Sequence, residues 1–260
     1  MAIIIQPTHQ ITIIAAGIIR DALIQKPNLV LGLATGSSSI GLYKHLVRMH
    51  NTEGLDFSKV KTFNLDEYVE IPCDHPQSYH TFMAKHFFNH VNIPKENQHI
   101  PQNTIFNHES FCTVYEEEIK RTGGIDIQVL GIGTDGHIAF NEAGSSLASR
   151  TRIVTLSEST LDANAIYFGG DPNAVPEMAI TMGIGTIMEA KQCLLLANGE
   201  AKAKAIAKAV EGPISASVPA SILQMHPNTT YLIDDTAASK LKEIEYYKRS
   251  YTNTQKLKSL

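Results

Sequence analysis

Two acidic residues and one histidine lie close together in the stretch DIQVLGIGTDGHIAFNEAGSS. Asp135, His137 and Glu142 fall within eight residues of one another, shortly after a hydrophobic run that ends in glycine. Carboxylates beside an imidazole orient the ring and shift its pKa, which suits the transfer of protons between neighbouring oxygen atoms. Structural loops also use Asp-Gly turns and buried histidines, so the segment alone leaves that interpretation open. We predict acid–base chemistry at this loop.

A further carboxylate follows another apolar run, in KTFNLDEYVEI. Asp66 and Glu67 come where a buried strand is expected to open into solvent at its carboxyl end. A carboxylate there can act as a general base in a cleft shielded from water. The competing interpretation is an acidic turn or a helix cap. Asp66 is therefore a candidate catalytic residue.

The segment LVLGLATGSSSIGLYKHL joins an apolar run to a helical pattern through Thr35, Gly36, Ser37, Ser38 and Ser39. Small residues let backbone amides approach an anion, hydroxyl groups donate further hydrogen bonds, and a helix N-terminus adds a favourable dipole. The segment is thus a candidate phosphate-binding loop, although helix capping alone would use the same residue types. It contains neither G-x-x-x-x-G-K-[ST] nor G-x-G-x-x-G, which disfavours nucleoside triphosphates and dinucleotides.

A zinc site is the competing interpretation of some of the 11 histidines. His86 and His90 are four residues apart on a predicted helix, with His75 and His80 nearby, and such spacing can bind zinc. The run HFFNH lacks the glutamate of the H-E-x-x-H motif, and its aromatic residues are typical of a packed amphipathic helix. We predict that the protein binds no metal.

The elements that must position these residues follow from hydrophobic patterning. Short β-branched runs alternate with helical patterns along the chain, which is typical of a parallel sheet covered by helices. We predict a doubly wound, Rossmann-like α/β fold with a mostly parallel sheet, helices on both faces, and one domain over residues 1–260. Ligands bind beyond the carboxyl ends of the strands in such sheets, and the three segments fall there.

Strands are expected over residues 28–34, 60–65, 125–131, 152–156, 178–182, 192–197 and 229–233, with another ahead of the first helix. Helices are expected over residues 8–25, 40–50, 78–90, 109–121, 200–210 and 237–247.

Composition limits the classes of partner. The net charge of -4 and the pI near 6.2 do not suit nucleic acid or an anionic membrane surface. Three cysteines, far apart and odd in number, argue against a disulfide framework and for a reducing compartment, so we expect a cytoplasmic protein. No signal peptide and no apolar run of about 20 residues is present, so we expect a soluble protein. A homo-oligomer is compatible with the sequence.

Taken together, the three segments resemble the glucosamine-6-phosphate deaminase (isomerizing) family. The similarity continues through SSLASRTRIVTLSEST, MGIGTIMEA and LLLANGEAKAKAIAKAVEG, and so covers nearly the whole chain. The pairing of LDEY with DGHIAFNE distinguishes the chain from 6-phosphogluconolactonases, which share the fold. The resemblance implies hydrolytic conversion of an amino-sugar phosphate, glucosamine 6-phosphate, to fructose 6-phosphate and ammonia, without redox cofactor or metal.

The resemblance also implies roles for single residues. His137, held by Asp135 and Glu142, would open the sugar ring, and Asp66 would move the proton between C2 and C1. The family's phosphate-binding lysine corresponds to Lys202, which joins the Thr35–Ser39 loop in binding the phosphate. Without the family match, Lys202 would be read as one of several solvated lysines in AKAKAIAK.

Two positions depart from the family pattern. Ile166, in DANAIYFGG, stands where the family usually places a lid arginine that binds the phosphate. Ser145 and Arg152 match residues that bind an acetylated amino-sugar phosphate in allosterically activated relatives, but Val154 replaces the lysine of that site. We therefore expect that another residue substitutes for the arginine, that phosphate binding is weaker, or that the preferred substrate differs, and we expect little or no allosteric activation.

Several functions remain compatible with these residues. The C4 epimer, galactosamine 6-phosphate, differs from the glucosamine form by one hydroxyl whose contacts the sequence does not place. A non-catalytic sugar-phosphate sensor is also compatible with them, and so is a lactonase or pentose-phosphate isomerase on the same fold.

Overall fold

The main sheet is parallel throughout, as its continuous hydrophobic strands predict. In this computed structural model, which describes residues 1–102 and 107–258, seven strands form one sheet. Their order is β1 (Ala2–Ile5), β10 (Thr229–Ile233), β9 (Gln192–Ala197), β6 (Ile127–Leu130), β2 (Val30–Leu33), β3 (Lys61–Asn64) and β5 (Gln98–His99). Strands such as β2 (VLGL) are buried on both faces, because helices cover each side of the sheet. The predicted α/β fold is confirmed.

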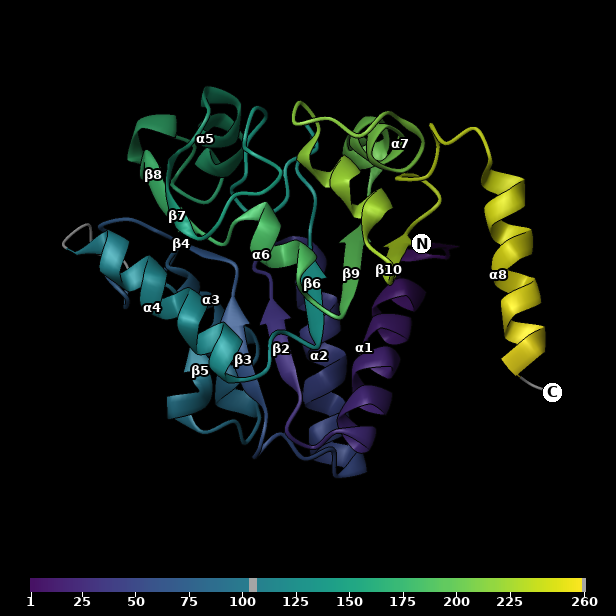
Figure 1. Ribbon diagram of the computed structural model, residues 1–260, viewed down its shortest axis with the longest axis horizontal. Coiled ribbons are helices and arrows are strands. Elements are labelled where there is room, and N and C mark those ends of the chain that lie inside the picture. The colour runs from purple at the N-terminus through teal and green to yellow at the C-terminus, as the bar shows by residue number, and fades with distance from the viewer. Residues whose placement is uncertain (103–106, 259–260) are drawn as a thin grey trace.

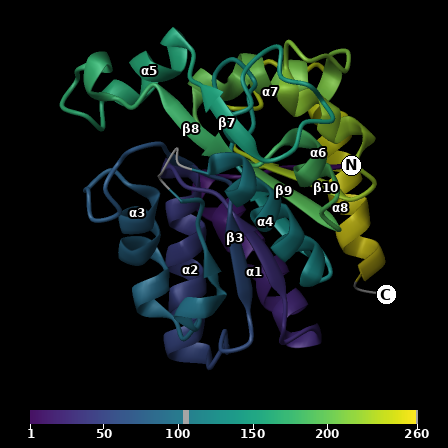
Figure 2. The same cartoon turned by 60° about the vertical axis from the view of Figure 1, so that its left-hand side comes forward.

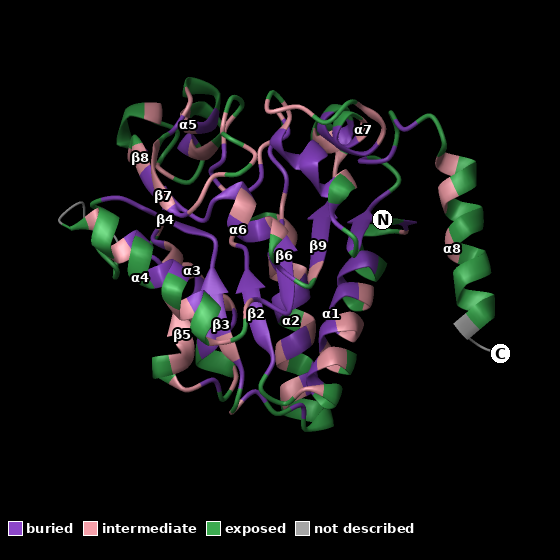
Figure 3. Ribbon diagram, viewed as in Figure 1, coloured by how far each residue is buried: buried purple, intermediate pink, exposed green. Residues whose placement is uncertain are grey.

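The helices are arranged in layers around this sheet. They are α1 (Thr8–Gln25), α2 (Ser37–Glu53), α3 (Tyr79–His86), α4 (His108–Arg121), α5 (Glu158–Ala165), α6 (Ile184–Met188), α7 (Ala203–Glu211) and α8 (Ile244–Lys258). Helices α1 and α2 lie side by side on one face, and α4 lies on the other (Figures 1 and 2). Buried residues concentrate in the strands and on the inner faces of these helices (Figure 3). None of the described helices is long and apolar enough to cross a bilayer.

A second sheet changes the predicted topology. Residues expected as members of the main sheet, 152–156 and 178–182, form β7 (Arg152–Thr155) and β8 (Met178–Thr181), which pair antiparallel. The third strand, β4 (Asp66–Tyr68), pairs antiparallel with β8. The chain passes from one sheet to the other at Leu65, whose N–H donates to Leu33 while its carbonyl accepts from Met182. Asp66 therefore opens a strand of the second sheet instead of hanging free beyond β3.

The predicted helix over 237–247 is wrong in its position. The Asp234 carboxylate accepts from Ala237 N and Thr236 Oγ1, and so holds a turn where the helix was expected. Helix α8 begins at Ile244, after Glu211 has accepted the N–H groups of Lys242 and Glu243. The sequence patterns also did not predict α5, α6, β4 or the two-residue β5.

Candidate active site

A cavity of about 350 Å³ opens at the carboxyl ends of the central strands. Residues that follow β2, β3, β6 and β9 line its base, and α5 with the residues after it lines the opposite side. The three segments singled out in the sequence thus meet at one place, where an open parallel sheet offers a ligand crevice.

The candidate phosphate loop lies along this cavity. Thr35, Gly36, Ser37 and Ser38 line it, and α2 begins at Ser37. Gly36 has a φ of 101°, a conformation that a side-chain-bearing residue rarely adopts, so glycine lets the loop turn into the helix. Ser39 is different, because its side chain is buried and Oγ donates to the Gly36 carbonyl at 2.8 Å. The structure thus places Ser39 outside the cavity lining.

Lys202 reaches the same cavity from the segment after β9. Among the described residues that line the cavity, it is the sole lysine or arginine. Burial lowers the pKa of its ammonium, and the charge of Asp135 partly opposes this effect. The segment is fixed from below, since Asp234 accepts the Gly199 N–H, and it meets the phosphate loop where Ser38 Oγ donates to Asn198 Oδ1 at 3.1 Å.

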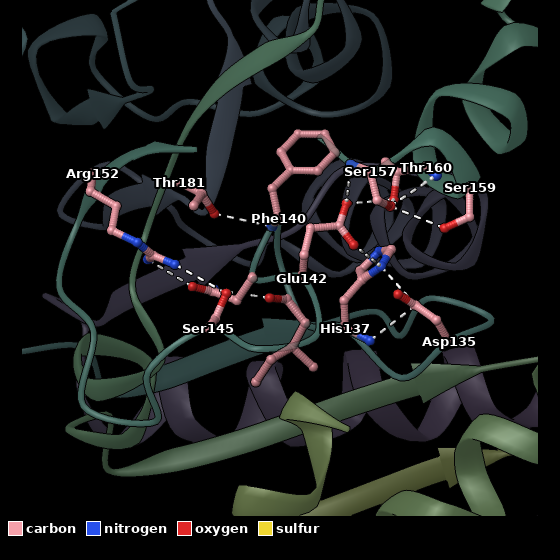
Figure 4. A network of polar contacts seen from close by, with 12 residues as sticks. Asp135, His137, Phe140, Glu142, Ser145, Arg152, Ser157, Ser159, Thr160 and Thr181 are labelled. Atoms are coloured by element: carbon pink, nitrogen blue, oxygen red, sulfur yellow. Dashed lines mark hydrogen bonds and ion pairs between the residues drawn. The ribbon is translucent and has the colours of Figure 1, made fainter. Parts of the chain in front are cut away.

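The loop after β6 brings its two acids to one histidine (Figure 4). His137 Nδ1 lies 2.8 Å from Asp135 Oδ1 and 3.8 Å from Glu142 Oε2. Partial burial works to raise the pKa of Asp135, but the interaction with His137 outweighs it and leaves that pKa at about 2. Gly133 makes the close approach possible, because a Cβ there would lie 2.4 Å from His137 Nδ1. Asp135 and His137 line the cavity, whereas Glu142 lies behind the ring.

Glu142 also connects this loop to the helix above the cavity. Its Oε1 accepts hydrogen bonds from Ser157 N at 3.1 Å and from Thr160 Oγ1 at 2.6 Å, at the start of α5 (Figure 4). The position of the imidazole is therefore linked to the position of α5.

Asp66 faces the cavity from the start of β4 and is nearly inaccessible to solvent, at 6% exposure. Burial, and secondarily the charge of the neighbouring Glu67, raises the pKa of Asp66 to about 8. A carboxyl group with this pKa is a stronger base, once ionised, than an ordinary aspartate.

The histidines considered as zinc ligands, His75, His80, His86 and His90, do not line the cavity. His86 packs against Phe82 in a tilted arrangement with ring centroids 4.6 Å apart, and His90 Nε2 lies 2.9 Å from the Lys85 carbonyl. In the described part of the chain, the residues that could together hold a metal ion are Asp135, His137 and Glu142, whose ligand atoms lie within 4.8 Å of one another. Both acids already interact with His137, and Glu142 with α5 as well.

Aromatic residues that the sequence patterns did not single out complete the lining. Tyr68 packs against three other rings at centroid distances of 5.1 to 5.7 Å. These rings come from α3, the loop after β6 and the segment after α5: Tyr79, Phe140 and Phe168. All four residues line the cavity. No spacing signal in the sequence marks them, because they come from four separate segments.

The two departures from the family pattern occupy different surroundings. Ile166 is 76% exposed and does not line the cavity, although Tyr167 and Phe168 beside it do. Ser145 and Arg152 meet, with Arg152 Nη2 donating to Ser145 Oγ at 3.2 Å, and Arg152 Nη1 also donates to Asn141 Oδ1 at 2.9 Å. Val154 lies two residues further along β7.

This geometry defines an open α/β protein with an acid–base site and one cation at the carboxyl ends of its parallel strands. The chain belongs to the family described as glucosamine-6-phosphate isomerases/6-phosphogluconolactonase, whose model matches residues 8–232. The family resemblance drawn from the sequence is thereby confirmed.

Known relatives agree on the branch of this family. The chain is 52% identical over 236 residues to a glucosamine-6-phosphate deaminase of Thermoanaerobacter pseudethanolicus, covering 89% of this chain and 93% of the relative. It is 53% identical over 234 residues to glucosamine-6-phosphate deaminase 2 of Bacillus subtilis, covering 90% and 94%. A solved structure of a monomeric glucosamine-6-phosphate deaminase matches with a TM-score of 0.89 and 45% identity, covering 92% of this chain and 100% of that one. A 6-phosphogluconolactonase from Trypanosoma brucei, at 19% identity and a TM-score of 0.74, shares the fold.

Proposed function

We propose that this enzyme converts glucosamine 6-phosphate and water into fructose 6-phosphate and ammonia. The observation that carries the proposal is that Asp66, Asp135, His137 and Lys202 line one cavity with a phosphate-type loop, and that Glu142 lies beside His137. The names of the relatives that match nearly the whole chain agree with this activity.

Binding of the phosphate comes first. Lys202 and the N–H and hydroxyl groups of residues 35–38 supply a cation, donors and a helix N-terminus at one end of the cavity. Ser39 supports this loop from behind through its bond to the Gly36 carbonyl. The sugar ring then extends toward Asp66 and His137.

Ring opening is the task of His137. It takes the proton of the anomeric hydroxyl and delivers a proton to the ring oxygen, which breaks the C1–O bond and leaves an open-chain aldehyde. Asp135 and Glu142, at 2.8 and 3.8 Å from Nδ1, stabilise the protonated ring that forms between these two transfers.

Isomerisation and deamination follow at Asp66. Its carboxylate removes the C2 proton, which the C1 carbonyl has made acidic, while a proton passes from the C2 ammonium group to the C1 oxygen. The Asp66 carboxyl group then returns its proton to C1 of the resulting enolamine. This leaves an imine at C2. Water adds to that carbon, and the C–N bond breaks to release ammonia.

We propose a single domain, because the cavity takes residues from both sheets. The three free cysteines suit a cytoplasmic location. The matched deaminase of known structure is described as monomeric, which favours a monomer over the homo-oligomer that the sequence left open.

Two assays test the activity: ammonia release from glucosamine 6-phosphate and from galactosamine 6-phosphate, and acid release from 6-phosphogluconolactone. We expect ammonia from glucosamine 6-phosphate at a higher kcat/KM than from its epimer, and no lactone hydrolysis above the background rate. Binding of sugar phosphate without ammonia release would instead favour a sensor, and faster lactone hydrolysis would favour a lactonase.

A further inference from the structure

Glu67 is a fully buried carboxylate that follows Asp66 but does not line the cavity. Its side chain is 0% exposed, and both carboxylate oxygens accept hydrogen bonds. Oε1 accepts from Tyr68 N at 2.8 Å, and Oε2 accepts from Tyr79 N at 2.8 Å and His80 N at 3.2 Å. His80 Nδ1 lies 3.0 Å from the same Oε2. Burying a carboxylate costs free energy unless hydrogen bonds replace its lost hydration. Each of these contacts therefore contributes to the stability of the buried Glu67 side chain.

These contacts join two parts of the cavity lining. Tyr79 and His80 are the first residues of α3, where a negative charge is favourable for the helix dipole. Residues 76–79, which lead into α3, line the cavity together with Phe82. Glu67 therefore attaches this wall to the strand that carries Asp66.

Side-chain alternation along β4 separates the two acids but keeps them close. Asp66 faces the cavity, while Glu67 points to α3. After burial, the charge of Glu67 is the cause that raises the pKa of Asp66. The other titratable groups that interact with one or both carboxylates are Tyr68, Tyr79 and Tyr115, and, on Glu67 alone, Cys73 and His80.

We propose that Glu67, paired with His80, is a positioning residue of the deaminase: it anchors the α3 wall and keeps a fixed negative charge behind Asp66. The charge makes Asp66 a stronger base than burial alone would, and His80 limits this effect by hydrogen bonding to the same carboxylate. The proposal deepens the proposed function and rests on it for the role of Asp66.

The direct test is titration of Asp66 by ¹³C NMR of labelled aspartate carboxyl groups, with Asp66→Asn used to assign the signal. In Glu67→Gln the titration midpoint is expected to fall by roughly one pH unit. In His80→Phe, which keeps the carboxylate and its backbone contacts, it is expected to rise. A midpoint that stays in place in both variants overturns the proposal, and so does a fall in His80→Phe.

Turnover gives the second measurement. The low-pH limb of kcat/KM is expected to move with the NMR midpoint, and kcat on the high-pH plateau to fall several-fold in Glu67→Gln, because a weaker base removes the C2 proton more slowly. A purely structural role would lower activity equally at all pH values and leave the limb in place, which would contradict the proposal.

Glu70→Gln is the matched control, since it removes the same charge from an exposed position three residues further along. It is expected to leave both the midpoint and the limb unchanged. Should Glu67→Gln fail to fold, the upward shift in His80→Phe decides the question. If the wild-type protein releases no ammonia, the proposed function fails, while the NMR midpoints still decide whether Glu67 and His80 control Asp66.

Discussion

Asp66 combines burial with a reactive carboxyl group, and its role can be separated from its effect on folding. An amide at this position keeps the shape but cannot accept the C2 proton. We expect Asp66→Asn to lower kcat by about 10²- to 10⁴-fold and to abolish C2 proton exchange measured in deuterated water, with binding of the sugar phosphate retained. Asp74→Asn, at an exposed position nearby, is the control. Retained turnover in Asp66→Asn would refute the assigned role.

The same substitution predicts a pH-dependent gain in stability. The pKa of Asp66 rises from an ordinary value of 3.8 to about 8 on folding, so the folded state binds this proton more tightly than the unfolded chain. Its contribution to stability is therefore complete below the lower value and is lost as pH rises toward the upper one. We expect the Tm of Asp66→Asn to exceed that of the wild type by an amount that grows over this range and then levels off. A difference that does not change with pH would argue against the raised pKa.

The segment formed by α5 and the residues after it departs from the family pattern at Ile166. Ile166 is exposed and apolar. Lys202 is therefore the single lysine or arginine among the described residues that line the cavity. We expect Ile166→Arg to lower KM for glucosamine 6-phosphate by roughly tenfold or more, because a charge-assisted hydrogen bond contributes about 1.5 to 3 kcal/mol. Ile166→Gln, polar but uncharged, is expected to change KM little. An unaltered KM in the arginine variant would show that the segment does not reach the phosphate.

The residues that correspond to the allosteric site of activated relatives lie on β7 and in the loop after β6. Arg152 already donates to Ser145 and Asn141, but Val154 provides no cation for an acetylated effector. We expect hyperbolic rate curves for glucosamine 6-phosphate that N-acetylglucosamine 6-phosphate leaves unchanged. A clear increase in rate on its addition would contradict this expectation.

Each edge strand of the main sheet is either short or covered by a helix. One edge strand, β5, is only two residues long, and α8 packs beside the other, β1 (Figure 1). Short or covered edges offer little backbone for pairing with a second copy. We expect a single species of 28.5 kDa in solution by light scattering. A species of twice that mass at working concentration would contradict the monomer.

Hydrophobic patterning in the sequence determined the α/β class and most element positions, because strands buried on both faces require continuous apolar runs. The loop containing Asp135, His137 and Glu142 was also predictable, since its residues are neighbours in the chain and neighbouring positions constrain each other directly. The same holds for the segment 35–39 as a turn into a helix, although only the structure shows that Ser39 faces away from the cavity.

Tertiary structure decided what depends on contacts between distant segments. The passage at Leu65 into a second sheet determines that Asp66 is buried, and burial is the main cause of its raised pKa. The link from Glu142 to α5 and the link from Glu67 to α3 each join residues more than ten positions apart. No local pattern encodes such pairs, because they form only when the fold brings their backbones together.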